Sequence, residues 1–428
     1  MALKRPLPAL MGGVSLSVLV SLGALAYQHL RTDALEERLL REVSMLTQAA
    51  HPRPAHVAPA RPGTFGEAVT PLLPALLKRM RELPAPTAAE TATLEAVTDG
   101  RAPVTDLPAA RLEALEQDRP LTRQVLDATH AESGGLPEDL HPLAGPSVPG
   151  RDVLLQALLH VVEDAALETR LLMARGMADQ AVDTCVDTLA LSRELALGGG
   201  LAGQRMSATS QGRAWRVCAD ALDAASLPRK RQAISQLTRL HEGIPPVSLA
   251  LHEESVTAQL HAFRDLLSDD GRAALPPTWF DAPALPDALS RRRQWRQWVD
   301  DADRLLAVVD QPAEERRRSL AALEIWKAGE HFRQEEAPSV RLSPEDMEAL
   351  ELRTLRSEAL IALAEVDAAR AETGQWPHAL PTRTTTLVLK PVDETQAQIH
   401  SCVQGLMPDA LVVKADGAPS RQQAHDVP

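Results

Sequence analysis

The chain has 428 residues, of which 44% are hydrophobic, so it is long and apolar enough to bury more than one core. Aromatic residues make up only 3%, so Leu, Ala and Val must fill these cores, which favours helices over sheets. The formal net charge of −13 argues against a protein that binds nucleic acid through its overall charge.

Residues 1–27 combine two basic residues, Lys4 and Arg5, with a long apolar run, "ALMGGVSLSVLVSLGALAY". This run is close to the ~20 residues that cross a bilayer as a helix. We interpret it as a signal anchor, which predicts a single-pass protein of the bacterial inner membrane with its body in the periplasm. Two alternatives stay open: a signal peptide cleaved before Tyr27, which would release a secreted protein, and a buried core helix.

The next 120 residues are less regular. Residues 28–50 continue an amphipathic pattern, which predicts a juxtamembrane helix. "HPRPAHVAPARPG", residues 51–63, contains four prolines and predicts a stiff, extended spacer. We expect the whole segment 51–150 to be Pro-rich and partly helical, and "SGGLPEDLHPLAGPSVPG" marks a break before the next domain.

Residues 151–374 predict an antiparallel α-helical bundle, because apolar residues recur at helical spacing and most connections are short. "GGG" at 198–200 ends the second of these helices, and further helices are expected around 246–268, 286–309, 312–335 and 344–373. "ARGMADQAVDTCVDTLALSREL" resembles half of a tetratricopeptide repeat. No clean second copy follows, so the bundle is TPR-like or solenoid-like without an evident repeat array.

Two cysteines lie on the inward faces of consecutive predicted helices. Cys185 and Cys218 lie 14 and 18 residues from the turn at 198–200, a difference of about four residues or roughly 6 Å along the helix axis. A disulfide requires Cα atoms within about 7 Å, so these two residues can form one in an oxidising compartment. The alternative is a pair of small buried thiols.

The last segment, residues 375–428, predicts a small β element followed by a disordered tail. "TTTLVLKP", "TQAQIHSCV" and "DALVVKADG" alternate in polarity and read as short strands. Before them, "AETGQWPHAL" predicts a helix stop: Gly374 can adopt a left-handed conformation, and Pro377 biases Trp376 to an extended one. We expect Trp376 and Leu380 to fold back onto the helix.

Motifs that suggest metal binding lack the required partners. "HEESV" at 252–256 begins like a zincin helix but has Val256 where the second His should stand. "HVVE" at 160–163 and "EDLH" at 138–141 each pair one acid with one His, whereas a di-iron bundle also needs two further Glu on facing helices. The spacing of the three cysteines matches no structural zinc site.

Other candidates are also better explained by structure. Asp183 and Asp187 are one helical turn apart and form a carboxylate pair, but they are expected on a solvated face. Ser147 lies in "GPSVPG", which does not match a nucleophile elbow. In "SRRRQWRQWVDDADRLLAVV", Trp295 and Trp298 fall on one apolar face with the Arg residues around it, which indicates core tryptophans and a solvated basic stripe.

The region from about 120 to 240, including "RLLMARGMADQAVDTCVDTLALSREL", resembles a group of uncharacterised exported α-helical proteins common in planctomycetes and myxobacteria. The later stretch "EALIALAEVDAARAETGQWPHAL" is similar to the helix and G-x-(Y/W)-P-x-x-L element of those proteins and of type II secretion pseudopilins. The chain lacks the prepilin cleavage site of pseudopilins, so that resemblance implies the local structure and not a role in a pilus. The exported helical proteins have no assigned activity, so the resemblance to them implies only a fold and a compartment.

These observations predict a membrane-tethered envelope protein that is a non-enzymatic scaffold or protein-interaction module. Its expected partners are the membrane, through the N-terminal helix, and other envelope proteins, with no nucleic acid. We assign no catalytic, cofactor-binding or metal-binding residues. The alternatives are an exported enzyme or small-ligand binder of unrecognised type, and a pseudopilin-like secretion component.

Overall fold

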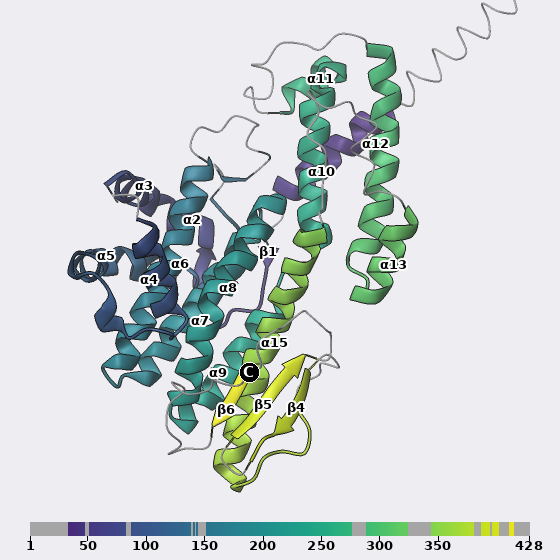
Figure 1. The fold of residues 1–428 in the computed structure, drawn as a ribbon. Helices are drawn as coiled ribbons and strands as arrows, with labels where there is room; N and C mark the ends of the chain where they lie inside the picture. Colours follow the sequence, from purple (N-terminus) through teal and green to yellow (C-terminus); the bar gives the residue numbers. More distant parts are fainter. Residues whose placement is uncertain are drawn as a thin grey trace, which may run out of the picture.

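The computed structural model describes residues 33–47, 51–82, 87–137, 140–141, 143, 151–275, 288–323, 344–380, 387–393, 396–401 and 411–414. The fold is mainly α-helical with two small three-stranded sheets, so the predicted helical class and the C-terminal β element are confirmed (Figure 1). The expected anchor at 1–27 lies outside the described residues. Within them, no helix combines the length and apolarity that a membrane crossing requires.

Five long helices form the central bundle. They are α6 Arg151–Ala174, α7 Ala178–Leu195, α8 Gly200–Ala224, α9 Leu227–Glu242 and α15 Pro344–Thr373. The predicted inward residues Val182, Cys185 and Val186 are at most 1% exposed and pack in one core with residues of α8, α9 and α15. Short turns connect the first four helices, and α7 lies side by side with both α6 and α8, as the sequence spacing predicts. The expectation fails for α9, which packs on α15 and α7 and not on its chain neighbour α8.

A layer of four further helices covers α6 on the left of Figure 1. It consists of α2 Phe65–Val69, α3 Leu73–Glu82, α4 Ala88–Thr98 and α5 Ala109–Ala128. Phe65, Leu126 and Leu158 are fully buried in the core shared by this layer and α6. The described part of the segment 51–150 thus belongs to the folded body.

A second sheet, which the sequence analysis did not predict, lies beside this layer. Its strands are β1 His51–Pro52, β2 Arg61–Thr64 and β3 Ala131–Gly134, with β3 antiparallel to β1 and parallel to β2. The prediction of an extended spacer at 51–63 is therefore wrong, because the chain there pairs with β3. Arg53 and His56 of this segment are buried, at 7% and 1% exposure. Proline prevents a helix, but a short extended segment can still dock on a polar part of the core.

The remaining helices form an arm at the upper right of Figure 1. They are α10 Val247–Phe263, α11 Asp269–Ala273, α12 Ala288–Val309 and α13 Ala313–Leu323. Trp295 is fully buried, stacks on Phe263 with ring centroids 5.4 Å apart and donates from Nε1 to Gln259 Oε1 at 3.0 Å. The prediction of core tryptophans is confirmed for Trp295 and Trp298, which are 0% and 7% exposed.

The helical segment 33–47 packs onto this arm rather than extending freely from the body. Leu39 and Leu46 lie in the same core as Trp295. Arg38 pairs with Asp303 of α12 at 2.6 Å. A tether that ends at this segment would therefore hold the body close to its attachment point.

The C-terminal sheet contains β4 Leu387–Pro391, β5 Gln396–Ser401 and β6 Leu411–Lys414, all antiparallel in the order β4-β5-β6. Before it, α15 ends at Thr373, and Gly374 has φ +73° and donates its N–H to Arg370 O at 2.9 Å. Trp376 packs partly against the core and donates from Nε1 to Asp393 O at 2.9 Å. The turn thus fastens the sheet to the helix end.

Candidate functional site

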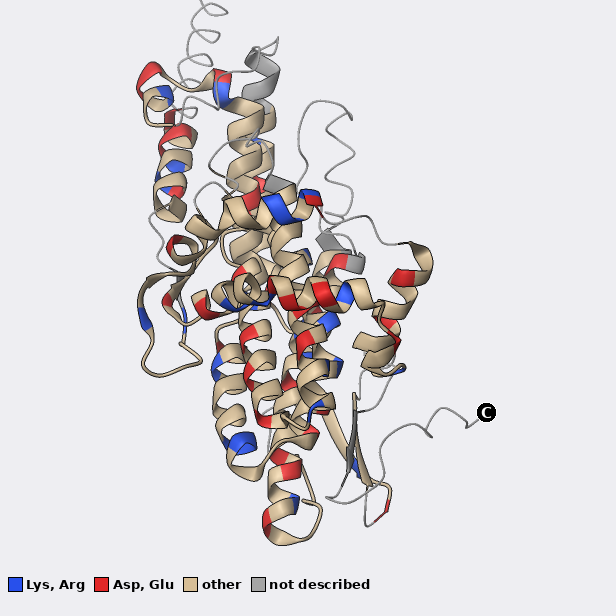
Figure 2. Cartoon of the chain, turned by 90° about the vertical axis from the view of Figure 1, so that its left-hand side faces the viewer, with Lys and Arg blue, Asp and Glu red and all other residues tan. Residues whose placement is uncertain are grey.

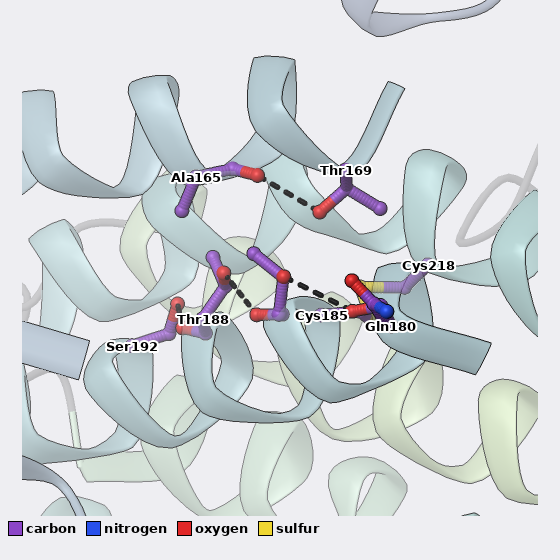
Figure 3. Close-up of a disulfide and its surroundings, with 8 residues drawn as sticks. Ala165, Thr169, Gln180, Cys185, Thr188, Ser192 and Cys218 are labelled. Carbon is purple, nitrogen blue, oxygen red and sulfur yellow. Dashed lines mark hydrogen bonds between the residues drawn. A yellow bond between two sulfur atoms is a disulfide. The ribbon is translucent and has the colours of Figure 1, made fainter. Parts of the chain in front are cut away.

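The predicted cysteine pair joins α7 to α8 (Figure 3). Cys185 and Cys218 form a disulfide in the structure, with Cα atoms 5.4 Å apart, and both residues are at most 1% exposed. Beside it, Thr188 donates its hydroxyl proton to Thr184 O at 2.6 Å, which satisfies a polar side chain within its own helix. The bond lies in the main core, where no reductant can reach it without local unfolding.

The histidines of the three weak metal motifs each lie near one carboxylate, and for His141 of "EDLH" this is Glu253, with Nε2 3.9 Å from Oε1. His160 Nδ1 lies 2.7 Å from Glu163 Oε2, as expected for residues three apart on one helix. His252 Nε2 lies 3.6 Å from Glu42 Oε2 of the helical segment 33–47. Ser147 and Glu138 lie outside the described residues. Among the described residues, no second histidine joins the His160–Glu163 pair or the His252–Glu42 pair to form a metal site.

The carboxylates of Asp183 and Asp187, expected as neighbours on a solvated face, have different surroundings. Asp183 has a 57% exposed side chain and pairs with Arg229 at 2.8 Å. Asp187 has a 13% exposed side chain and contacts His56 and His130. The expectation of a solvated face therefore fails for Asp187. The sequence carried no signal for this cluster, because the two histidines are 131 and 57 residues away along the chain.

A buried ionic group lies beneath the cluster. Arg53 Nε is 2.7 Å and Arg193 Nη2 is 3.1 Å from the same Glu194 Oε1. Burial lowers the pKa of Arg193 to about 10, against the opposing effect of Glu194. Arg193 also donates to Pro54 O at 3.1 Å, so this group fastens the 51–61 segment to α7.

A groove of about 530 Å³ is a second candidate site among the described residues. Its walls are the α9–α10 connection, the α12–α13 connection and the first half of α15. The volume falls within the ~300–1,000 Å³ of typical ligand pockets. The lining mixes apolar and polar side chains, and the apolar ones include Ile244, Pro245, Val247, Met347 and Leu350.

Arg353 lies where the groove meets the bundle core. Its residue is only 4% exposed, and Nη1 donates to Gln204 Oε1 at 2.6 Å and Ser207 Oγ at 3.2 Å, both on α8. Nε is buried without a partner, and no carboxylate of the described chain pairs with the guanidinium. Burial lowers the pKa of Arg353 to about 10, so it stays charged at neutral pH. A small cavity of about 20 Å³ beside it has room for a water molecule.

The acidic side chains of the groove have partners already. Glu351 accepts from Arg316 and from Arg317, the latter at 2.7 Å. Glu358 lies 3.9 Å from His241. Figure 2 shows the same pattern on a larger scale, with acidic and basic residues interspersed along the helices. Arg353 thus has no neutralising partner among the described residues, in contrast to these acidic side chains. Arg356, three residues further along α15, also has no carboxylate partner there and lies over the ring of Trp215.

Comparison with known proteins identifies no relative of this chain: no family model, no curated protein and no solved structure matches it.

Proposed function

We propose that this chain is a non-enzymatic interaction protein of the cell envelope that binds a carboxylate of a partner polypeptide in the groove at Arg353. The observation that carries the proposal is the buried, charged guanidinium without an acidic partner in the described part of the chain. Burying an unpaired charge is costly, and a carboxylate that enters the groove would offset this cost. The ion pair between the partner's carboxylate and the Arg353 guanidinium would then supply part of the binding energy.

Two further observations support the location. Residues 1–27 have the composition of a signal anchor, which would tether the body to the inner membrane. The disulfide between Cys185 and Cys218 requires an oxidising compartment, such as the periplasm, to form and persist. Because the segment 33–47 packs on the α10–α12 arm, such a tether would keep the groove near the membrane and favour other envelope proteins as partners.

A small carboxylate ligand is the second candidate, because the groove volume of about 530 Å³ fits a small molecule as well as a peptide segment. Native mass spectrometry of the protein purified from its own membrane separates the two. A small anion that is bound in the wild type and absent from Arg353→Met would favour the ligand binder over the interaction module.

The direct test places a photo-crosslinking amino acid at Thr354, which lines the groove, in cells that produce the full chain. The matched control places it at Thr373, which is exposed at the far end of α15. We expect Thr354 to crosslink one partner through a segment with an acidic side chain or a chain end. The crosslink should disappear in Arg353→Met and remain in Arg231→Met, which removes an exposed arginine paired with Glu372.

A partner that crosslinks equally in Arg353→Met, or only from Thr373, would contradict the proposed groove. The tether has its own test: mass spectrometry of the N-terminus after cell fractionation. An intact N-terminus in the membrane fraction supports the anchor, whereas a start at Tyr27 in the soluble fraction supports a secreted protein.

A further inference from the structure

Two histidines and one aspartate from distant parts of the chain converge on one point. His56 Nε2 lies 3.0 Å and His130 Nε2 lies 2.8 Å from the same Asp187 Oδ1, and the three ligand atoms are all within 4.8 Å of one another. His56 precedes β2, His130 lies between α5 and β3, and Asp187 is on α7. The loop, the turn and the helix each contribute one side chain.

The backbone around the cluster is held firmly, so the three side chains are positioned before any ion binds. Arg61 N donates to His130 O at 2.9 Å, which joins the two histidine-bearing segments where β2 pairs with β3. Arg53 Nη2 donates to Thr129 O at 3.1 Å from the other side. Preorganised ligands of this kind raise metal affinity because little ordering entropy remains to be lost on binding.

The donor set is one that metals prefer. Two imidazole nitrogens and one carboxylate oxygen match the three-ligand sites of zinc and of other transition metals, which complete their shell with water or substrate. Among the described residues the buried ring of His56 has no partner at Nδ1, and its hydrogen bond there is the one from Nε2 to Asp187. The alternative role for the cluster is a hydrogen-bonded triad that only fastens the 51–61 segment to the bundle.

The surroundings narrow the choice of ion. The Arg53–Glu194–Arg193 group beneath the cluster carries one excess positive charge, which works against any cation. This charge disfavours the binding of Mg²⁺ and Ca²⁺ most, because these ions need several oxygen ligands that the site does not offer. It disfavours ions that bind imidazole strongly the least. The side chains of His130 and Asp187 are 22% and 13% exposed, so an ion can enter from this side.

We propose that His56, His130 and Asp187 form a binding site for one transition-metal ion, with Zn²⁺ as the ion that its ligands suit best. The ion would join the 51–61 loop, the α5–β3 turn and α7 more firmly than the hydrogen bonds do. The site is independent of the groove at Arg353, so either assignment can fail without the other.

The test uses the full chain in detergent, purified without a polyhistidine tag, stripped with a chelator and titrated with ZnCl₂ by calorimetry. We expect one Zn²⁺ per chain in the wild type and in His160→Ala, which removes a histidine that pairs with a carboxylate elsewhere. His130→Ala and Asp187→Asn should lose more affinity than the about 10- to 100-fold that removal of an outer-shell partner costs.

Absence of saturable Zn²⁺ binding to the folded wild type would overturn the proposal, and so would wild-type affinity in His130→Ala. Circular dichroism checks that each variant is folded. If His130→Ala does not fold, titration of the wild type with Co²⁺ decides the question. Visible ligand-field absorption that one equivalent of Zn²⁺ abolishes supports the site, and its absence overturns it.

Discussion

Removal of the disulfide should destabilise the protein by several kcal/mol. The perturbation is the double substitution Cys185→Ala and Cys218→Ala, which opens a crosslink between residues 33 positions apart. Loop-closure entropy for this length gives about 3.7 kcal/mol at 25 °C, because the uncrosslinked unfolded chain gains conformational freedom. Urea unfolding followed by circular dichroism should show this loss in the free energy of unfolding, together with a larger dependence on urea concentration.

The matched control is Cys402→Ala, which should leave the disulfide between Cys185 and Cys218 in place. Peptide mapping of the full chain, purified from its cells without reduction, provides the chemical readout, because bonded cysteines resist alkylation. Alkylation of both Cys185 and Cys218 in the unreduced wild type would refute the disulfide itself. An intact disulfide with a loss below about 1 kcal/mol would instead refute the entropic reasoning about the unfolded state.

Three further predictions concern single residues. Glu253 is fully buried, and burial raises its pKa to about 7, although a hydrogen bond from Gly200 N acts in the opposite direction. The folded state therefore holds a proton that the unfolded chain releases. The free energy of unfolding should decrease as the pH rises from 4.5 to 7. Glu253→Gln should remove up to about 3 kcal/mol of this dependence, measured as unfolding free energy against pH. Gly374→Ala should cost about 1 kcal/mol because φ is +73° with open space around it, and Gly374→Asn should cost less, as thermal unfolding can show. Trp295→Ala should cost about 3–5 kcal/mol by urea unfolding, since it removes a buried ring stacked on Phe263, whereas an unchanged midpoint would contradict this packing.

Arg353→Met offers a different kind of check, because it separates stability from binding. Replacement of a buried charge by an apolar side chain of similar length should leave the ligand-free protein equally stable or more stable. The same change should abolish binding in the groove. The free energy of unfolding should therefore stay the same or increase, while the yield of the Thr354 crosslink decreases. Loss of stability would indicate that the hydrogen bonds to Gln204 and Ser207 outweigh the cost of burying the charge.

Local pattern was sufficient for most helices and for the C-terminal strands. The apolar spacing around Cys185 defined an inward face, and a short glycine turn placed the next helix beside it, so the cysteine pair could be predicted. Gly374 and Pro377 similarly marked a helix stop that depends only on neighbouring backbone angles. Each of these features arises from contacts between residues close in sequence or on adjacent helices.

Only the tertiary structure decided where the polar groups lie. His56, His130 and Asp187 have no local signature, and the chain between them must fold before the distances between them exist. The second sheet and the docking of the segment 51–63 likewise depend on pairing with β3, about 70 to 80 residues later. The burial of Arg353 is a further example. Its position in the helix is compatible with an exposed or a buried arginine, and it is buried because α8 and the α9–α10 connection cover it. Periodicity encodes which face of a helix is apolar, whereas the burial of a particular charge depends on which other elements pack against that face.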